Sequence, residues 1–89
     1  MEFQIGDKVK WRSQAGGSWT VKEGCIIAVV PAKKRARDYI PEAYHGCQRM
    51  FDGFPRQRKS YLVGVPGGKT AEAKPRLYWP HASKLEKVT

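Results

Sequence analysis

The chain has 89 residues, which is enough for one small domain and too few for two. Its hydrophobic share of 40% excludes a disordered tail, because disordered segments carry too little apolar surface to fold. The 17 lysines and arginines outnumber the 8 acidic residues, and the net charge of +9 favours an anionic partner, either nucleic acid or an acidic protein surface.

The cysteine content and the hydropathy pattern exclude further classes. The chain has two cysteines, Cys25 and Cys47, so it cannot form a disulfide-rich framework. No apolar stretch approaches the roughly 20 residues of a membrane-spanning helix, and the N-terminus does not resemble a signal peptide. We therefore expect a cytoplasmic protein without a membrane partner.

The first predicted strand is residues 5–12, where apolar and basic residues alternate. A period of two is typical of a half-buried strand, because successive side chains point to opposite faces. Val9 and Trp11 are therefore expected to point inward. The basic residues are expected to form a cationic row on the opposite face: Lys8, Lys10 and Arg12. Residues 13–18, which include two adjacent glycines, predict a loop.

The second predicted strand is residues 19–30. Gly24 interrupts it, and an isolated glycine in a strand predicts a bulge or a sharp bend. The apolar run from Cys25 to Val30 is expected to form the centre of the core, with the Cys25 thiol buried as a small hydrophobic group. Trp19 follows the glycine-containing loop and is therefore a candidate for an exposed aromatic side chain.

Residues 31–60 form a basic insert between the second and third predicted strands. Its cations lie near its two ends: Lys33, Lys34, Arg35, Arg37, Arg56, Arg58 and Lys59. If the two ends meet, these cations converge, and such a cluster suits the phosphate groups of a nucleic acid. A solvated mobile loop is the alternative for a segment with so many charges.

The centre of the insert has an apolar pattern typical of one face of a helix. The apolar residues of this pattern are Ile40, Ala43, Tyr44, Cys47, Met50 and Phe51. Pro41 suits the first position of a helix, and Glu42 suits the positive end of the helix dipole. The pattern predicts one short helix, and an ordered loop with aromatic anchors is the alternative.

Three further strands are predicted after the insert, at residues 61–65, 76–79 and 85–88. Residues 80–84 predict a turn that includes one turn of 3₁₀ helix. Tyr78 and Trp79 are adjacent in a strand, so their side chains point to opposite faces and one of them is expected to be exposed. Trp11, Tyr61 and the other member of that pair are expected to fill the core.

Together these elements predict a mostly all-β fold in one domain, residues 1–89: a small five-stranded barrel with the insert at residues 31–60. The sequences G-D-K-V-K-W, Y-L-V-G-V and L-Y-W-P-H-A-S-K-L-E-K-V resemble the SH3-like barrel group, which includes Tudor-type and KOW-type modules. The resemblance covers residues 5–30 and 61–88 and omits the insert. It implies a fold rather than one particular function.

The chain is also similar to the plasmid-borne type II dihydrofolate reductases. The similarity lies at G-D-K-V, at the Gly-Gly loop before Trp19, and at Y-W-P-H-A-S-K-L-E-K-V. The resemblance implies that residues 76–79 correspond to the V-Q-I-Y strand of that family, whose glutamine faces the pterin. Leu77 stands at the position of this glutamine here. Because the group that the chemistry needs is absent, we do not expect reductase activity.

Other motifs give weaker indications of chemistry. Residues 64–70 place three residues between the glycines where a phosphate-binding loop has four, and Pro75 follows too soon for the helix that such a loop requires. The residues that could ligate zinc form no second close pair: Cys25, His45, Cys47 and His81. No spacing supports a nucleophile paired with a base. We expect no enzymatic activity, no cofactor and no metal.

The leading hypothesis is a non-enzymatic nucleic-acid-binding module, in which cations contact phosphates and an exposed aromatic ring stacks on bases. The expected binding residues are Lys33, Lys34, Arg35, Arg37, Arg56, Arg58, Lys59, Lys8, Lys10, Arg12, Trp19 and Tyr78. The alternative is a protein-interaction module for an acidic partner, such as a phage or mobile-element protein that joins or inhibits a host nucleoprotein complex. An open strand edge would allow a homodimer.

Overall fold

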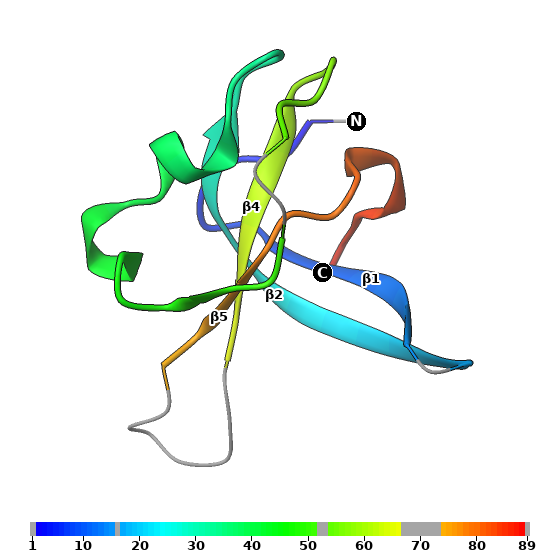
Figure 1. Ribbon diagram of the computed structural model, residues 1–89. Helices are drawn as coiled ribbons and strands as arrows, with labels where there is room; N and C mark the ends of the chain where they lie inside the picture. Colours follow the sequence, from blue (N-terminus) through cyan, green and yellow to red (C-terminus); the bar gives the residue numbers. More distant parts are fainter. Residues whose placement is uncertain (1, 16, 52–53, 67–73, 89) are drawn as a thin grey trace.

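The computed structural model describes residues 2–15, 17–51, 54–66 and 74–88 (Figure 1). These residues contain one sheet of six strands and three short 3₁₀ helices. The strands are β1 (Lys8–Ala15), β2 (Ser18–Val30), β3 (Gln48–Arg49), β4 (Ser60–Val65), β5 (Arg76–Tyr78) and β6 (Glu86–Lys87). The 3₁₀ helices are η1 (Ala36–Tyr39), η2 (Glu42–Tyr44) and η3 (Ala82–Lys84).

The sheet is mixed, and its strands lie in the order β3-β5-β4-β2-β1-β6. Neighbouring strands pair antiparallel except β3 and β5, which are parallel. The predicted mostly-β class is therefore confirmed. The sheet differs from the prediction in having a sixth strand, β3, inside the insert. The pairings of the described strands give an open order, with β3 at one end and β6 at the other, rather than a closed ring.

The strands lie close to their predicted positions, but the first hairpin is longer than expected. β1 extends to Ala15 and β2 begins at Ser18, so most of the segment predicted as a loop is paired. Gly17 lies in the turn between them with a φ of 83°, a conformation that glycine adopts easily. Residues 5–7 form a turn before β1 rather than part of the strand predicted over residues 5–12, and the predicted 3₁₀ turn, now η3, is confirmed.

The central strands bury side chains on both faces of the sheet. On β4, Tyr61 and Val63 pack on one face, and Leu62 between them packs on the other. One cluster, the inner core, contains Phe3, Val9, Trp11, Ile26, Tyr61, Val63 and Leu85. A second cluster, the outer core, contains Ile27, Ala28, Val30, Ala36, Ile40, Leu62, Leu77 and Trp79. A strand that is buried on both faces has a continuous apolar sequence, as β4 does.

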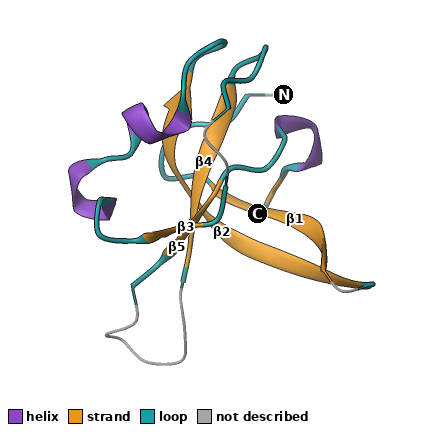
Figure 2. Ribbon diagram, in the orientation of Figure 1, coloured by secondary structure: helices purple, strands orange, loops and turns teal. Residues whose placement is uncertain are grey.

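The insert covers the outer core. Figure 2 shows η1 and η2 on one side of the sheet and η3 on the other. Ala36 and Ile40 are buried, and the rings of Tyr39, Tyr44 and Phe51 pack against the same cluster. The insert is therefore an ordered layer of the domain, which is the alternative with aromatic anchors rather than the solvated loop.

The prediction of one helix in the centre of the insert is wrong. The segment forms two 3₁₀ helices followed by strand β3. Ile40 separates the two helices with a φ of −70° and a ψ of 121°, because the residue before a proline is disfavoured from the helical region. Four residues of the apolar pattern pack against the outer core from successive turns, Ile40, Tyr44, Cys47 and Phe51, whereas Ala43 and Met50 are exposed.

Two expectations for β2 are also corrected. Cys25 is exposed rather than buried, because it lies directly opposite Lys8 and shares that residue's face of the sheet. The irregularity expected at Gly24 lies further along, where the register shifts between Ile26 and Ala28. Because of this shift, Ile27 and Ala28 both pack into the outer core.

Gly24 allows β2 and β4 to approach each other closely. It is buried, and a Cβ atom at this position would lie 2.8 Å from Cγ1 of Val63 and closer still to the carbonyl oxygen of Gly64. No larger residue fits there unless the two strands move apart.

We therefore expect Gly24→Ala to lower the free energy of unfolding by about 1–3 kcal/mol, because the added methyl group meets backbone rather than a flexible side chain. Gly46→Ala is the matched control. The nearest atom to a Cβ at Gly46 is Nζ of Lys74 at 3.2 Å, and this long side chain can move. The control should change stability by less than about 0.5 kcal/mol. Urea unfolding of both variants measures the difference, and equal midpoints would contradict the close-approach argument.

Candidate functional site

The two ends of the insert meet. The backbone N–H of Lys33 donates a hydrogen bond to the carbonyl oxygen of Arg56, with an N–O distance of 2.6 Å. Lys33 has a φ of 67°, in the left-handed region that residues with a Cβ rarely adopt. A second hydrogen bond, from the N–H of Lys34 to the carbonyl oxygen of Pro31, closes the turn. The two basic segments therefore lie side by side at one end of the molecule (Figure 1).

Six cations of these segments are exposed, and we refer to four of them as the basic end: Lys33, Lys34, Arg35 and Arg58. In the part of the chain that the structure describes, none of these four forms an ion pair with a carboxylate. Arg37, on η1, lies 4.0 Å from the Asp38 carboxylate, and this exposed contact offsets part of its charge. The basic end therefore carries a concentrated positive charge that no neighbouring described acid neutralises.

Two of the predicted binding cations have structural contacts instead. The guanidinium of Arg56 lies over the ring of Trp79, 4.1 Å from its centroid. It donates hydrogen bonds to the carbonyl oxygens of Trp79 and Pro80, the second at 2.9 Å. Lys59 lies 2.6 Å from the carboxylate of Glu2. This hydrogen bond lowers the pKa of Glu2 and raises the pKa of Lys59.

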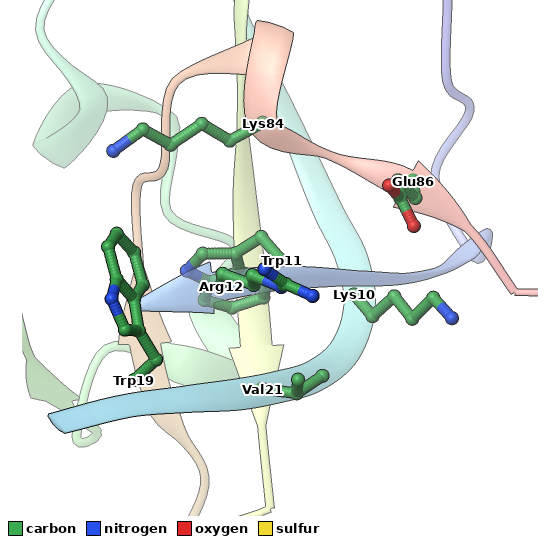
Figure 3. Close-up of a pocket in the computed structure, with 7 residues that line it drawn as sticks. All are labelled: Lys10, Trp11, Arg12, Trp19, Val21, Lys84 and Glu86. Carbon is green, nitrogen blue, oxygen red and sulfur yellow. The ribbon is translucent and has the colours of Figure 1, made fainter. Parts of the chain in front are cut away.

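The predicted cationic row on β1 lies on a different surface. Lys10 and Arg12 line a groove together with Trp19 and Val21 of β2, Lys84 of η3 and Glu86 of β6 (Figure 3). We call this the tryptophan groove. Its volume is 530 Å³, and the buried Trp11 also lines it. Lys8 lies further along the same face of β1, opposite Cys25.

The register of the sheet explains why these groups share one face. Arg12 lies directly opposite Val21, and Lys10 lies opposite both Glu23 of β2 and Glu86 of β6. Trp19 is two residues before Val21 and so projects from the same face of β2. Trp19 is 63% exposed and Val21 is 62% exposed, which places two large apolar side chains next to three cations.

Tyr78, the other predicted stacking residue, is not part of this groove. It is half-buried beside the inner core, and its ring contacts the edge of Trp11 at a centroid distance of 5.7 Å. The ammonium of Lys22 lies 4.9 Å from the centroid of the Tyr78 ring. Trp79 is buried in the outer core, so it is the core member of the adjacent aromatic pair, and Trp19 and Tyr78 do not form one platform.

The structure thus divides the predicted site residues among three environments: the basic end, the tryptophan groove, and contacts within the fold. The basic end and the tryptophan groove are separate surfaces: the first lies at the turn after β2, and the second lies on the β1–β2 hairpin, which projects from the other end of the molecule (Figure 1). Val21, Lys84 and Glu86 were not predicted as site residues. Val21 could have been inferred from its spacing to Trp19, whereas Lys84 and Glu86 reach the groove only through the pairing of β1 with β6.

The structure describes only some of the remaining sequence motifs. Leu77, at the position of the reductase glutamine, is fully buried in the outer core. Residues 67–70 of the glycine-rich segment lie outside the described residues. Among the residues that are described, no group of three or more histidine, cysteine, aspartate or glutamate side chains could hold a metal ion. No helix in the described part of the chain is long and apolar enough to cross a membrane.

Comparison of this chain with protein-family models, with curated proteins and with solved structures found no match.

The contacts of Arg56 predict that it stabilises the fold, unlike its neighbour Arg58. Arg56→Ala removes hydrogen bonds to two carbonyl oxygens and the contact with the Trp79 ring, so we expect the free energy of unfolding to fall by about 1–3 kcal/mol. Arg58→Ala removes the same charge from an exposed side chain and should change stability by less than about 0.5 kcal/mol. Chemical denaturation compares the two, and an equal loss in both variants would exclude a special role for Arg56.

Proposed function

We propose that this protein is a non-enzymatic nucleic-acid-binding module, built as an SH3-like barrel that carries a basic insert. The fold part of this proposal is supported by the strand order. β1, β2, β4 and β5 pair successively as antiparallel neighbours, and β6 returns to pair with β1, so the first and last strands are adjacent. The insert adds β3 at the opposite end and covers the outer core without interrupting this order.

The observation that carries the functional proposal is the hydrogen bond from Lys33 to Arg56. It joins the two ends of the insert and so gathers the four exposed cations of the basic end. A cluster of cations that form no ion pair with the described carboxylates attracts phosphates, because each neutralised phosphate releases counterions from the nucleic acid. The arginines Arg35 and Arg58 can each present two donors to one phosphate group.

The anchoring of the basic end also supports this proposal. The turn that holds Lys33 and Lys34 is fixed by two backbone hydrogen bonds, and the facing segment is fixed through the Arg56 side chain to the backbone of residues 79–80. Cations on an ordered backbone lose less conformational entropy on binding than cations on a mobile loop. Because phosphates carry no sequence information, binding should depend weakly on base sequence and steeply on salt.

The test is a salt series with a variant of the basic end, Lys34→Ala/Arg35→Ala/Arg58→Ala. Affinity for a short duplex and for a single strand of the same length is measured by fluorescence anisotropy at several salt concentrations. We expect the variant to bind more weakly and the slope of log affinity against log salt to fall by roughly 0.7–0.9 for each lost phosphate contact.

The matched control is Arg49→Ala/Lys74→Ala/Arg76→Ala, which removes three exposed cations near the paired strands β3 and β5. Both triple variants lower the net charge of +9 by the same amount, so a general charge effect would weaken binding equally in both. If neither the duplex nor the single strand binds at low salt, the proposed function is wrong. Binding to an acidic polypeptide but to neither nucleic acid would indicate a protein partner instead.

A further inference from the structure

The tryptophan groove is an unusual surface for a small domain because it exposes a large aromatic ring among cations. Trp19 and Val21 are more than half exposed, whereas the other two tryptophans, Trp11 and Trp79, are 6% and 3% exposed. Contiguous exposed apolar groups with a polar rim are typical of binding surfaces. Figure 3 shows the Trp19 ring standing at one side of the groove, with the Lys84 side chain extending above it.

The chemistry of the groove fits one nucleotide. The indole offers a flat face for stacking, and the three lining cations Lys10, Arg12 and Lys84 outnumber the lining carboxylate of Glu86, even when Glu23 opposite Lys10 is counted with it. Its volume of 530 Å³ lies within the roughly 300–1,000 Å³ that is common for sites of small organic ligands. A nucleotide supplies a flat ring and an adjacent phosphate in one unit, which matches an aromatic ring beside basic side chains.

We infer that the tryptophan groove receives one unpaired base, which stacks on Trp19 while its phosphate contacts Arg12 or Lys84. This inference rests on the proposed function and names its substrate class, a single-stranded nucleic acid. In the interior of a duplex both faces of each base are covered by neighbouring bases, so no base presents a free face to the Trp19 ring. The basic end binds phosphates of either form, and the groove adds a contact that only a single strand can make.

Trp19 also provides the readout. Trp11 lines the groove but is only 6% exposed, and Trp79 is buried in the outer core, so an added ligand that stacks in the groove should quench chiefly the fluorescence of Trp19. We expect a 16-nucleotide oligothymidylate to quench the emission and a duplex of equal length to leave it almost unchanged. Trp19→Ala should weaken binding of the single strand roughly 5- to 150-fold and leave duplex binding unchanged. Trp19→Phe keeps a stacking ring and should recover much of the affinity.

The control is Ile5→Ala, which truncates another exposed apolar side chain that does not line the groove. If Trp19→Ala binds the single strand as tightly as Ile5→Ala does, the inference is wrong. In that case the proposed function still stands if the triple variant of the basic end loses affinity. If an aromatic, glutamate-rich peptide quenches Trp19 and the oligonucleotide does not, the groove binds a protein segment and the inference is overturned. If no nucleic acid binds at low salt, the proposed function fails together with the inference.

Discussion

Burial of the central strands on both faces is the constraint on which the rest of this structure depends. A domain of 89 residues has little apolar surface to bury, and a single core between two layers contributes a limited stabilisation. Here the strands β2, β4 and β5 contribute to an inner and an outer core, and the outer one exists only because the insert packs on it. The insert is therefore part of the folded domain as well as the support of its most basic surface.

The same arrangement positions the charges. The guanidinium of Arg56 is used to hold the insert against Trp79, while Arg58, two residues later, is exposed at the basic end. The groove on the other surface is formed by a hairpin whose outer part extends beyond the core, so Trp19 is left exposed on it. The stability of the fold and the two candidate binding surfaces thus depend on different side chains. A substitution can therefore change one binding surface without removing a contact that stabilises the fold.

Local patterns in the sequence predicted the strands because alternation and burial act within a few residues. Alternation predicts Val9 and Trp11 inside, the glycine-containing loop before Trp19 makes that residue a candidate for exposure, and the structure agrees. The helical spacing between Ile40 and Phe51 was misleading, since short turns packed on a sheet repeat apolar anchors at similar intervals. The contacts of Arg56 with residues 79–80 and of Lys10 with the β6 strand could not be inferred, because they connect segments that are distant in the chain and leave no local signature.

The pairing of β1 with β6 has a consequence for the order of folding. Val9 lies opposite Lys87, so this edge of the sheet cannot form until almost the whole described chain has left the ribosome. Contacts between such distant segments require loop closure before they stabilise the chain, and domains rich in them fold more slowly. The edge of β1 that pairs with β6 is therefore unpaired until the end of the described chain has been synthesised. Lys8, Lys10 and Arg12 on this strand are the kind of charged residues that disfavour pairing of an open edge with other chains.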